Sequence, residues 1–559
     1  MTGSMRTTWR SITALVLLLP ACWQASAAEA ARGSTSRPNI LLIISDDIGL
    51  DANTDMYPGL IDDLVRQYGP GGRNHPQYRQ IAGHPASTPT LNALAQSGMR
   101  FTQAWAQPFC SPTRVSMITG LFSVKTGVLD YYNWATASHR TLVHELKEKA
   151  GYTAAAFGKW HMAGLGQSQY PGLKPKEAGF DLYQGNLNGA PSTYWLYEYH
   201  VQDAATPADK YRTEPTPTRS LPGIAATTYA PVTQVADALQ WIRAQEAQRP
   251  TRPWLAWVAF NNAHITENQQ PNPMAVPNID TLDEPTRREM QACGGQFGSA
   301  NVGRCTDKAL HRALTNSMDT IIGRLLQAVD ALDPNTYVIF VGDNGTWMFG
   351  ANREFIDNMY ITRLDRSKGS AYESGVRVPL VVRGPGIRAG SSSDVPVHAV
   401  DMFATVLELA GLDVPATVPD RNAGKVKVDG KSFAPVLLKN AQQTRDPLRD
   451  ALVVDVVNPT KQNLRQSAAR NARYKVLCTG TAATADCEFY DLVEDPLEEY
   501  KLPRPASCDP YQKGSSQPQT REWNFCRLQE VLAKESALSL PPPPPSAPAA
   551  RPAPARPAG

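Results

Sequence analysis

Residues 40–47 read ILLIISDD, and residues 337–345 read YVIFVGDNG. In both stretches an unbroken apolar run ends at acidic or amide side chains. Such runs are typical of strands that are buried on both faces of a sheet. The same pattern occurs at Tyr152–Phe157, before Gly158-Lys159-Trp160-His161, and at Trp254–Phe260, before Asn261-Asn262-Ala263-His264.

These four strand ends predict one shared crevice. In open α/β sheets, ligands bind beyond the carboxyl ends of the strands, so the polar residues that follow the four runs should converge. Between the strands, residues 141–151 predict a helix that Thr141 caps and Gly151 ends. This alternation of strands and helices predicts an α/β catalytic domain over residues 38–440.

Asp46, Asp47, Asp343 and Asn344 form the candidate metal site. Each pair alone is an ordinary turn sequence. At converging strand ends, however, they would bring three carboxylates and an amide oxygen together, which is electrostatically costly without a cation. Such hard oxygen ligands suit Ca²⁺, with Mg²⁺ as the alternative, rather than zinc.

Residues 109–120, FCSPTRVSMITG, place a cysteine at the start of a short predicted helix. Pro112 suits the first turn of that helix and Gly120 its end, so Cys110 should lie at the positive end of the helix dipole. This environment favours an anion. The alternatives are a buried structural thiol and an unmodified thiolate nucleophile.

The segment from Cys110 to Arg114 resembles the signature of the type I sulfatases, in which the cysteine is oxidised to formylglycine. The resemblance covers roughly residues 38–502 and implies the alkaline-phosphatase-like α/β fold, a large mixed sheet flanked by helices, with a smaller C-terminal α+β subdomain. The motifs that match the family in order are Asp46-Asp47, Thr88–Ala95, Cys110–Arg114, Gly158–His161, Asp343–Gly345, Lys368–Gly375 and Tyr490–Leu492.

This resemblance implies the hydrolysis of sulfate esters to an alcohol and sulfate. Cys110, converted to formylglycine, would be hydrated to a geminal diol and would contact a single divalent metal, whose protein ligands are Asp46, Asp47, Asp343 and Asn344. One hydroxyl of the diol would attack sulfur, and the second would expel sulfate after the alcohol leaves. Maturation then needs a formylglycine-generating enzyme as a partner.

The resemblance also assigns the remaining catalytic residues. Lys159 and Lys368 would stabilise charge on the sulfate oxygens, and Arg114 would hold the diol. His264 would be the general acid and His161 the general base. His264 departs from the family pattern, because Ile265 and Thr266 follow it where a proline is common. We expect structural roles for Glu373, Arg377, His84, His139 and His144.

The C-terminal part of the chain predicts a subdomain over residues 441–538, with strands at Asp450–Val457 and Tyr474–Leu477. Residues 539–559 are rich in proline and alanine and predict a disordered tail. Segments 51–87 and 184–230 are rich in Gly, Pro, Tyr and Asn, so we expect them to be loop insertions over the pocket, where loops often set specificity.

Residues 1–27 have the layout of a secretory signal peptide that ends in Ala25-Ser26-Ala27. We therefore expect an exported protein, periplasmic or secreted. A second interpretation treats Leu19–Cys22 as a lipoprotein cleavage box, which would leave a lipid anchor on Cys22. No later apolar run approaches the ~20 residues that span a bilayer, so the mature chain should not be membrane-spanning.

The other six cysteines form three close sequence pairs. In an oxidising compartment the economical pairing is Cys293 with Cys305, Cys478 with Cys487, and Cys508 with Cys526. Buried free thiols are the alternative.

Charge and composition point to no macromolecular partner. The chain has 55 Lys and Arg against 52 Asp and Glu, a net charge of +3, and no basic run that would bind nucleic acid. A sulfated small molecule or sugar is the expected substrate, with aryl, sugar, choline and steroid sulfates all open. The competing interpretations are a phosphonate monoester or phosphodiester hydrolase with the same site, and a non-catalytic calcium-binding envelope protein.

Overall fold

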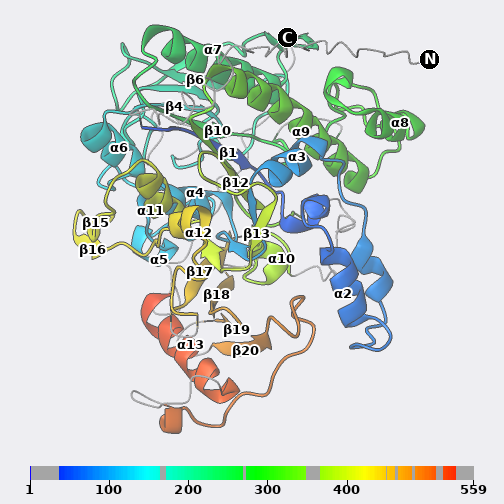
Figure 1. Ribbon diagram of the computed structural model, residues 1–559, viewed down its shortest axis with the longest axis vertical. Helices are drawn as coiled ribbons and strands as arrows, with labels where there is room; N and C mark the ends of the chain where they lie inside the picture. Colours follow the sequence, from blue (N-terminus) through cyan, green and yellow to red (C-terminus); the bar gives the residue numbers. More distant parts are fainter. Residues whose placement is uncertain are drawn as a thin grey trace, which may run out of the picture. The chain divides into compact units, whose positions relative to one another are not determined.

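The apolar run at residue 40 forms β1 (Asn39–Ser45), an inner strand of a ten-stranded mixed sheet in the computed structural model of the protein (Figure 1). Strands β11 (Thr336–Gly342) and β10 (Trp254–Ala259) pair with β1 in parallel, and β4 (Thr153–Gly158) pairs with β10. All four predicted buried strands are therefore confirmed, and they are adjacent in the sheet.

The structure describes Met1 and residues 37–163, 172–267, 272–347, 366–447, 450–459, 464–480, 485–511 and 520–536. The predicted signal peptide, Cys22 and the proline-rich tail lie outside the described residues. Pro38 and the residues after it form one compact unit. None of the helices in the described segments is both long and apolar enough to cross a bilayer.

Shorter strands complete the sheet on both sides. The order across the sheet is β13-β2-β12-β11-β1-β10-β4-β5-β6-β7. Strand β12 runs antiparallel to β11, and β6 runs antiparallel to β5, so the sheet is parallel at its centre and mixed towards its edges. The added strands are β2 (Met99–Phe101), β5 (Leu182–Gly185), β6 (Tyr199–Gln202), β7 (Arg212–Glu214), β12 (Leu380–Arg383) and β13 (Ser391–Ser393).

Helices cover both faces of the sheet (Figure 1). Alternate side chains of β1 point to opposite faces, so Leu41 and Ile43 join one core while Ile40, Leu42 and Ile44 join the other. This double burial explains the unbroken apolar run. The first core includes α3 (Pro89–Ser97), α7 (Ala230–Gln248) and α9 (Asp307–Leu332), and the second includes α4 (Cys110–Thr119), α6 (Leu142–Ala150) and α11 (Asp401–Leu409).

The predicted helix over residues 141–151 is α6, and its ends follow the sequence signals. The hydroxyl of Thr141 accepts a hydrogen bond from the N–H of His144, and Gly151 ends the helix at φ 70°. Only a residue without a Cβ adopts that angle at no steric cost.

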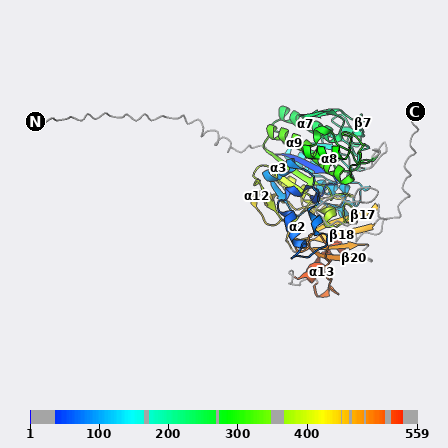
Figure 2. The same ribbon diagram turned by 90° about the vertical axis from the view of Figure 1, so that its right-hand side faces the viewer.

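The C-terminal part forms a four-stranded antiparallel sheet in a meander order, β17 (Leu452–Asn458), β18 (Leu464–Arg470), β19 (Tyr474–Thr479) and β20 (Asp486–Asp491). One face packs against α13 (Arg521–Glu535), which lies next to the small sheet in Figure 2. The other face packs against Trp105, Tyr372 and Val376. Both strands predicted in this region are confirmed, as β17 and β19. The three predicted disulfides are confirmed, and Cys110 is a free cysteine.

The expectation that segments 51–87 and 184–230 are loops is wrong. The first contains α2 (Leu60–Tyr68), and the second contains β5 to β7 together with the hairpin of β8 (Arg219–Leu221) and β9 (Ile224–Thr227). Flanking Gly and Pro residues mask the helical spacing of Leu60, Leu64 and Tyr68, and strands of three or four residues are too short to show a period. The remaining elements are η1 (Leu50–Met56), η2 (Tyr78–Ala82), β3 (Ala104–Trp105), α5 (Ser123–Thr126), η3 (Ile279–Thr281), α8 (Glu284–Ala292), α10 (Glu373–Val376), β14 (Val397–His398), β15 (Thr417–Pro419), β16 (Lys425–Lys427), α12 (Ala434–Lys439) and η5 (Asp509–Tyr511).

A buried charge network joins the small sheet to residues 366–376. Lys475 of β19 lies 3.1 Å from the Glu373 carboxylate and 2.7 Å from that of Glu498. Glu498 also accepts a hydrogen bond of 2.6 Å from the N–H of Glu373. All three side chains are buried. The network therefore fixes the segment that carries Lys368, and it places Glu373 in the structural role expected for it.

We expect Lys475→Met to destabilise the protein by about 3–5 kcal/mol, because two buried carboxylates lose the cation between them. Urea unfolding measures the change. The control is Lys501→Met, since this mostly exposed lysine pairs with Glu488 at the surface and should change the free energy of unfolding by no more than about 1 kcal/mol. A Lys475→Met variant as stable as the Lys501→Met control would contradict the role of the network.

Candidate active site

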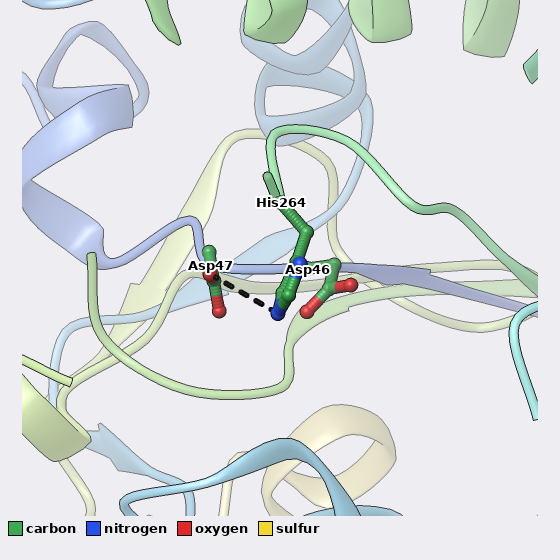
Figure 3. Close-up of side chains that lie close together, drawn as sticks. All are labelled: Asp46, Asp47 and His264. Atoms are coloured by element: carbon green, nitrogen blue, oxygen red, sulfur yellow. Dashed lines mark ion pairs between the residues drawn. The ribbon is translucent and has the colours of Figure 1, made fainter. Parts of the chain in front are cut away.

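The predicted catalytic residues all lie together beyond the carboxyl ends of the central strands. Asp46 and Asp47 follow β1, Lys159 and His161 follow β4, His264 follows β10, and Asp343 and Asn344 follow β11. Cys110 is the first residue of α4, and Lys368 belongs to the segment that the buried network fixes. Figure 3 shows the imidazole of His264 reaching towards the carboxylates of Asp46 and Asp47.

Local backbone geometry turns the site residues inward. Asp47 and His161 have φ angles of 58° and 55°, in the left-handed region that non-glycine residues rarely adopt. Helix α4 begins at Cys110, has Pro112 in its first turn, and ends at Gly120 with φ 72°, as predicted. A Cβ at residue 120 would lie 2.8 Å from the ring of Phe403, so the site needs glycine there.

Buried oxygen atoms of Asp46, Asp47 and Asn344 form a set that would fit a divalent cation. Asp46 Oδ1, Asp47 Oδ2 and Asn344 Oδ1 are buried and accept no hydrogen bond from the described residues. The ligand atoms of Asp46, Cys110 and Asp343 lie within 4.8 Å of one another, and so do those of Asp46, Asp47 and His264. Buried acceptors without donors are costly, and a cation would satisfy them together.

Three buried cationic side chains neutralise these carboxylates. Lys159 Nζ lies 2.5 Å from Asp46, Arg114 Nη2 lies 2.9 Å from Asp343, and Lys368 Nζ pairs with Asp47. Burial, with help from the neighbouring carboxylates, raises the pKa of Asp46 to about 8 in spite of Lys159. Burial also acts on Asp47, but there Lys368, His264 and Lys159, with a hydrogen bond from Asn344, together outweigh it and lower the pKa. A bound cation would stabilise the ionised form of every carboxylate in the set.

Cys110 and His161 are in direct contact. Cys110 Sγ lies 3.0 Å from His161 Nδ1, and the other ring nitrogen lies 3.2 Å from the carbonyl oxygen of Tyr131. Burial raises the pKa of the Cys110 thiol and lowers that of His161, so both groups are neutral at neutral pH. Burial thus keeps the thiol protonated in spite of the positive end of the helix dipole. This argues against an unmodified thiolate nucleophile.

His264 lies beside Asp46 and Asp47. Its Nε2 lies 3.7 Å from Asp47 Oδ2, and its Nδ1 lies 2.7 Å from the carbonyl oxygen of Ile265. Tyr194 donates a hydrogen bond of 2.7 Å to the backbone oxygen of His264 and fixes its position. Burial, together with Lys368 and Lys159, lowers the pKa of His264 to about 3.

A cavity of about 440 Å³ opens above these residues. Phe109 and Tyr131 contact each other edge to face, with ring centroids 5.0 Å apart, and Tyr132 lies 4.4 Å beyond Tyr131, so the three rings form an aromatic wall. The described lining residues are Phe109, Cys110, Tyr131, Tyr132, His161, Gly189, Ala190, His264, Ile265, Thr266, Glu267, Trp347 and Lys368.

Sequence reasoning missed several of these residues. Tyr131, Tyr132, Trp347 and Glu267 come from loops, and no spacing in the sequence connects them to the strand ends. The adjacent tyrosines at 131–132, close after the cysteine segment, are the one signal that the sequence offered. His311 of α9 was also missed, and its Nε2 lies 3.2 Å from the backbone oxygen of Asp47.

The residues for which structural roles were expected lie outside the cavity lining. Arg377 donates hydrogen bonds of 3.0 and 2.6 Å to the carbonyl oxygen of Thr102. His144 belongs to the cap of α6, His139 bonds within its own turn, and His84 is exposed. The contacts of Arg377, His139 and His144 agree with the roles expected for them, and the role of His84 stays a prediction.

Comparison with known proteins identifies the family. A family model described as Sulfatase matches residues 38–412, and one described as N-sulphoglucosamine sulphohydrolase, C-terminal, matches residues 366–512. An ulvan-active sulfatase of Formosa agariphila is 28% identical over 447 residues, which cover 75% of this chain and 73% of the relative. Arylsulfatase G of Rattus norvegicus is 27% identical over 73% of this chain and 70% of its own length.

Solved structures share the fold. The structure of Ps i-CgsB in complex with k-i-k-neocarrahexaose has a TM-score of 0.58 at 20% identity and covers 83% of this chain and 88% of that chain. A structure in complex with its substrate D-glucosamine-2-N,6-O-disulfate has a TM-score of 0.55 at 19% identity, over 89% of this chain and 98% of that chain.

The mixed sheet, its helices and the smaller C-terminal sheet define an alkaline-phosphatase-like fold, as the resemblance implied. The chain belongs to the sulfatase family, since the family model spans residues 38–412 of its 559 residues. It is accordingly a sulfuric ester hydrolase, and the interpretation of the sequence as a type I sulfatase is confirmed.

Proposed function

We propose that Cys110 is the nucleophilic residue of this sulfatase after oxidation to formylglycine, and that Asp46, Asp47, Asp343 and Asn344 hold one divalent cation beside it. The observation that carries the proposal is the convergence of buried, unsatisfied oxygens and three buried cationic groups on one free cysteine. A formylglycine-generating enzyme is the maturation partner that this chemistry needs.

The bound cation would be Ca²⁺. It would supply Lewis-acid stabilisation of the negative charge on the sulfate oxygens. The ligand set favours calcium over Mg²⁺, because calcium accepts many protein oxygens while magnesium keeps several waters. Lys159 and Lys368 add fixed positive charge at the same end of the cavity, and Arg114 orients residue 110 through its place beside Asp343.

The two histidines move protons. His161, 3.0 Å from the side chain of residue 110 and neutral at neutral pH, accepts the proton when the hydrated side chain reacts. His264 protonates the departing alcohol. The pKa of His264 is low beside two lysines, and an anionic sulfate ester in the cavity adds the negative charge that raises it towards the working range.

The substrate that this site suits best is a sulfated sugar or another ring-bearing sulfate ester. Relatives act on ulvan and on N-acetylgalactosamine 6-sulfate by their names, and a structural neighbour binds a disulfated glucosamine. The aromatic wall of Phe109, Tyr131 and Tyr132 offers a surface on which one face of a ring can stack.

An exported protein accords with this assignment. The three disulfides need an oxidising compartment such as the periplasm or the exterior of the cell. The signal peptide at residues 1–27 and the alternative lipid anchor on Cys22 are part of the same proposal.

We expect His264→Gln to impair poor leaving groups far more than good ones, because only a poor leaving group needs a proton as it departs. The loss in kcat/KM should be about 10³-fold for phenyl sulfate and less than about 10-fold for 4-nitrophenyl sulfate. Sulfate release on both substrates measures it. The control His84→Gln changes an exposed histidine and should affect neither. Equal losses on the two substrates would remove His264 from the acid role.

A further inference from the structure

The charges around the cavity are unevenly distributed. Lys368 and Glu267 are the side chains with a formal charge at neutral pH among the described residues that line it. Lys368 belongs to the sulfate end, because it pairs with Asp47 and lies near Lys159 and Arg114. The rest of the described lining is available to the alcohol part of the substrate, and Glu267 is the charged residue there.

Glu267 is exposed to solvent, and its backbone position is fixed. Its N–H donates a hydrogen bond of 3.1 Å to the carbonyl oxygen of Pro191, next to Ala190 in the cavity wall. The preceding residue, Thr266, donates from its N–H and from its hydroxyl to the carbonyl oxygen of Pro273, both at 3.0 Å. The backbone that carries the carboxylate is thus held at the cavity by bonds to two different chain segments.

A second acid strengthens the negative field at this position. Partial burial of its carboxylate at the cavity raises the pKa of Glu267, and the nearby carboxylate of Glu198 raises it further. The nearest wall residues, Ile265 and Ala190, bring no charge that would offset these two carboxylates. A substrate whose sulfate lies against the buried lysines has its alcohol part along the rest of the described lining, which includes both Glu267 and the aromatic wall.

We propose that Glu267 selects sulfate esters whose alcohol part carries no second anionic group. The inference rests on the proposed function, because it takes the lysine-lined end as the sulfate end. A carboxylate or a second sulfate near Glu267 meets a like charge in a partly desolvated cavity, whereas a neutral group does not and a cationic group is attracted. This preference separates the chain from the neighbour whose structure holds a disulfated sugar.

Binding to the calcium-loaded Cys110→Ala protein tests the selection without turnover. The probes are three phenyl sulfates with a meta carboxylate, carboxamide or trimethylammonium group, measured by calorimetry. On this background, Glu267→Gln should raise the affinity for the carboxylate probe about fivefold to tenfold and lower the affinity for the trimethylammonium probe by a similar factor. The affinity for the carboxamide probe should change by less than about twofold. Glu267→Lys should invert the order of the two charged probes.

The matched control is Glu535→Gln, an exposed glutamate at the end of α13, which should change none of the three affinities. Equal changes for all three probes, no change, or no binding of any probe would overturn the inference. Turnover of the same esters by the protein with Cys110 is a separate readout. The protein with Cys110 could fail to turn the esters over while the binding affinities still follow the predicted order of charges. That result would count against the proposed nucleophile and not against the role of Glu267.

Discussion

The Cys110→Ala variant should lose sulfatase turnover by at least about 10⁴-fold while it keeps its fold. Residue 110 is buried at the start of α4 and touches His161, and an alanine fits the same space. In the proposed mechanism the hydrate of formylglycine forms the sulfated enzyme with one hydroxyl and releases sulfate with the other, and alanine has neither hydroxyl. Turnover of 4-nitrophenyl sulfate and the thermal midpoint measure the two parts of the result.

Cys110→Ser provides the matched control for size and polarity. It restores a hydroxyl but no aldehyde, so its turnover should be nearly as low as that of the alanine variant unless the host oxidises serine. Near-normal turnover of Cys110→Ala would end the proposed mechanism, because the nucleophile would then have to be another group.

The Asp46→Asn variant should lose both calcium binding and activity, the latter by about 10³-fold. In a chelator its stability should change little. Burial, Asp343 and Asp47 raise the pKa of Asp46 to about 8 in spite of Lys159, so without a cation the carboxyl is largely protonated at neutral pH and an amide replaces it at the same charge. The amide cannot ionise when the metal binds, so the affinity for the metal is lost.

Thermal unfolding with and without calcium separates a metal ligand from a structural residue. Calcium at 100 times its Kd should stabilise the unchanged protein by about 2.7 kcal/mol and Asp46→Asn by almost nothing. Asp209→Asn, at an exposed aspartate, should keep the full shift. A full calcium shift together with normal turnover in Asp46→Asn would exclude residue 46 from the metal site.

The central strands and the site at their ends could be predicted because short stretches of sequence determine them. Burial on both faces forces unbroken apolar runs such as residues 40–44, and the carboxyl ends of parallel strands meet at one edge. The cap of α6 and the start of α4 at Cys110 follow from single residues. The disulfides pair cysteines that are 9 to 18 residues apart, for which proximity in sequence is a good guide.

The rest depends on contacts that no local pattern records. Lys475 and Glu373 are 102 residues apart and meet only because the small sheet packs against residues 371–376. Tyr131, Trp347 and Glu267 reach the cavity from loops, whose course is set by the residues they pack on. The position of Cys110 at the start of a helix could be predicted from the sequence. Its burial, which raises the pKa of its thiol, could not.

The central claim is that residue 110 is a formylglycine, and the mass of the tryptic peptide 101–114 tests it most directly. The protein should be made in a host that has the maturing enzyme. We expect a mass about 18 Da below that of the cysteine form, since the oxidised side chain loses sulfur and two hydrogens and gains an aldehyde oxygen. An unmodified thiol in a preparation that hydrolyses sulfate esters at full rate would contradict it.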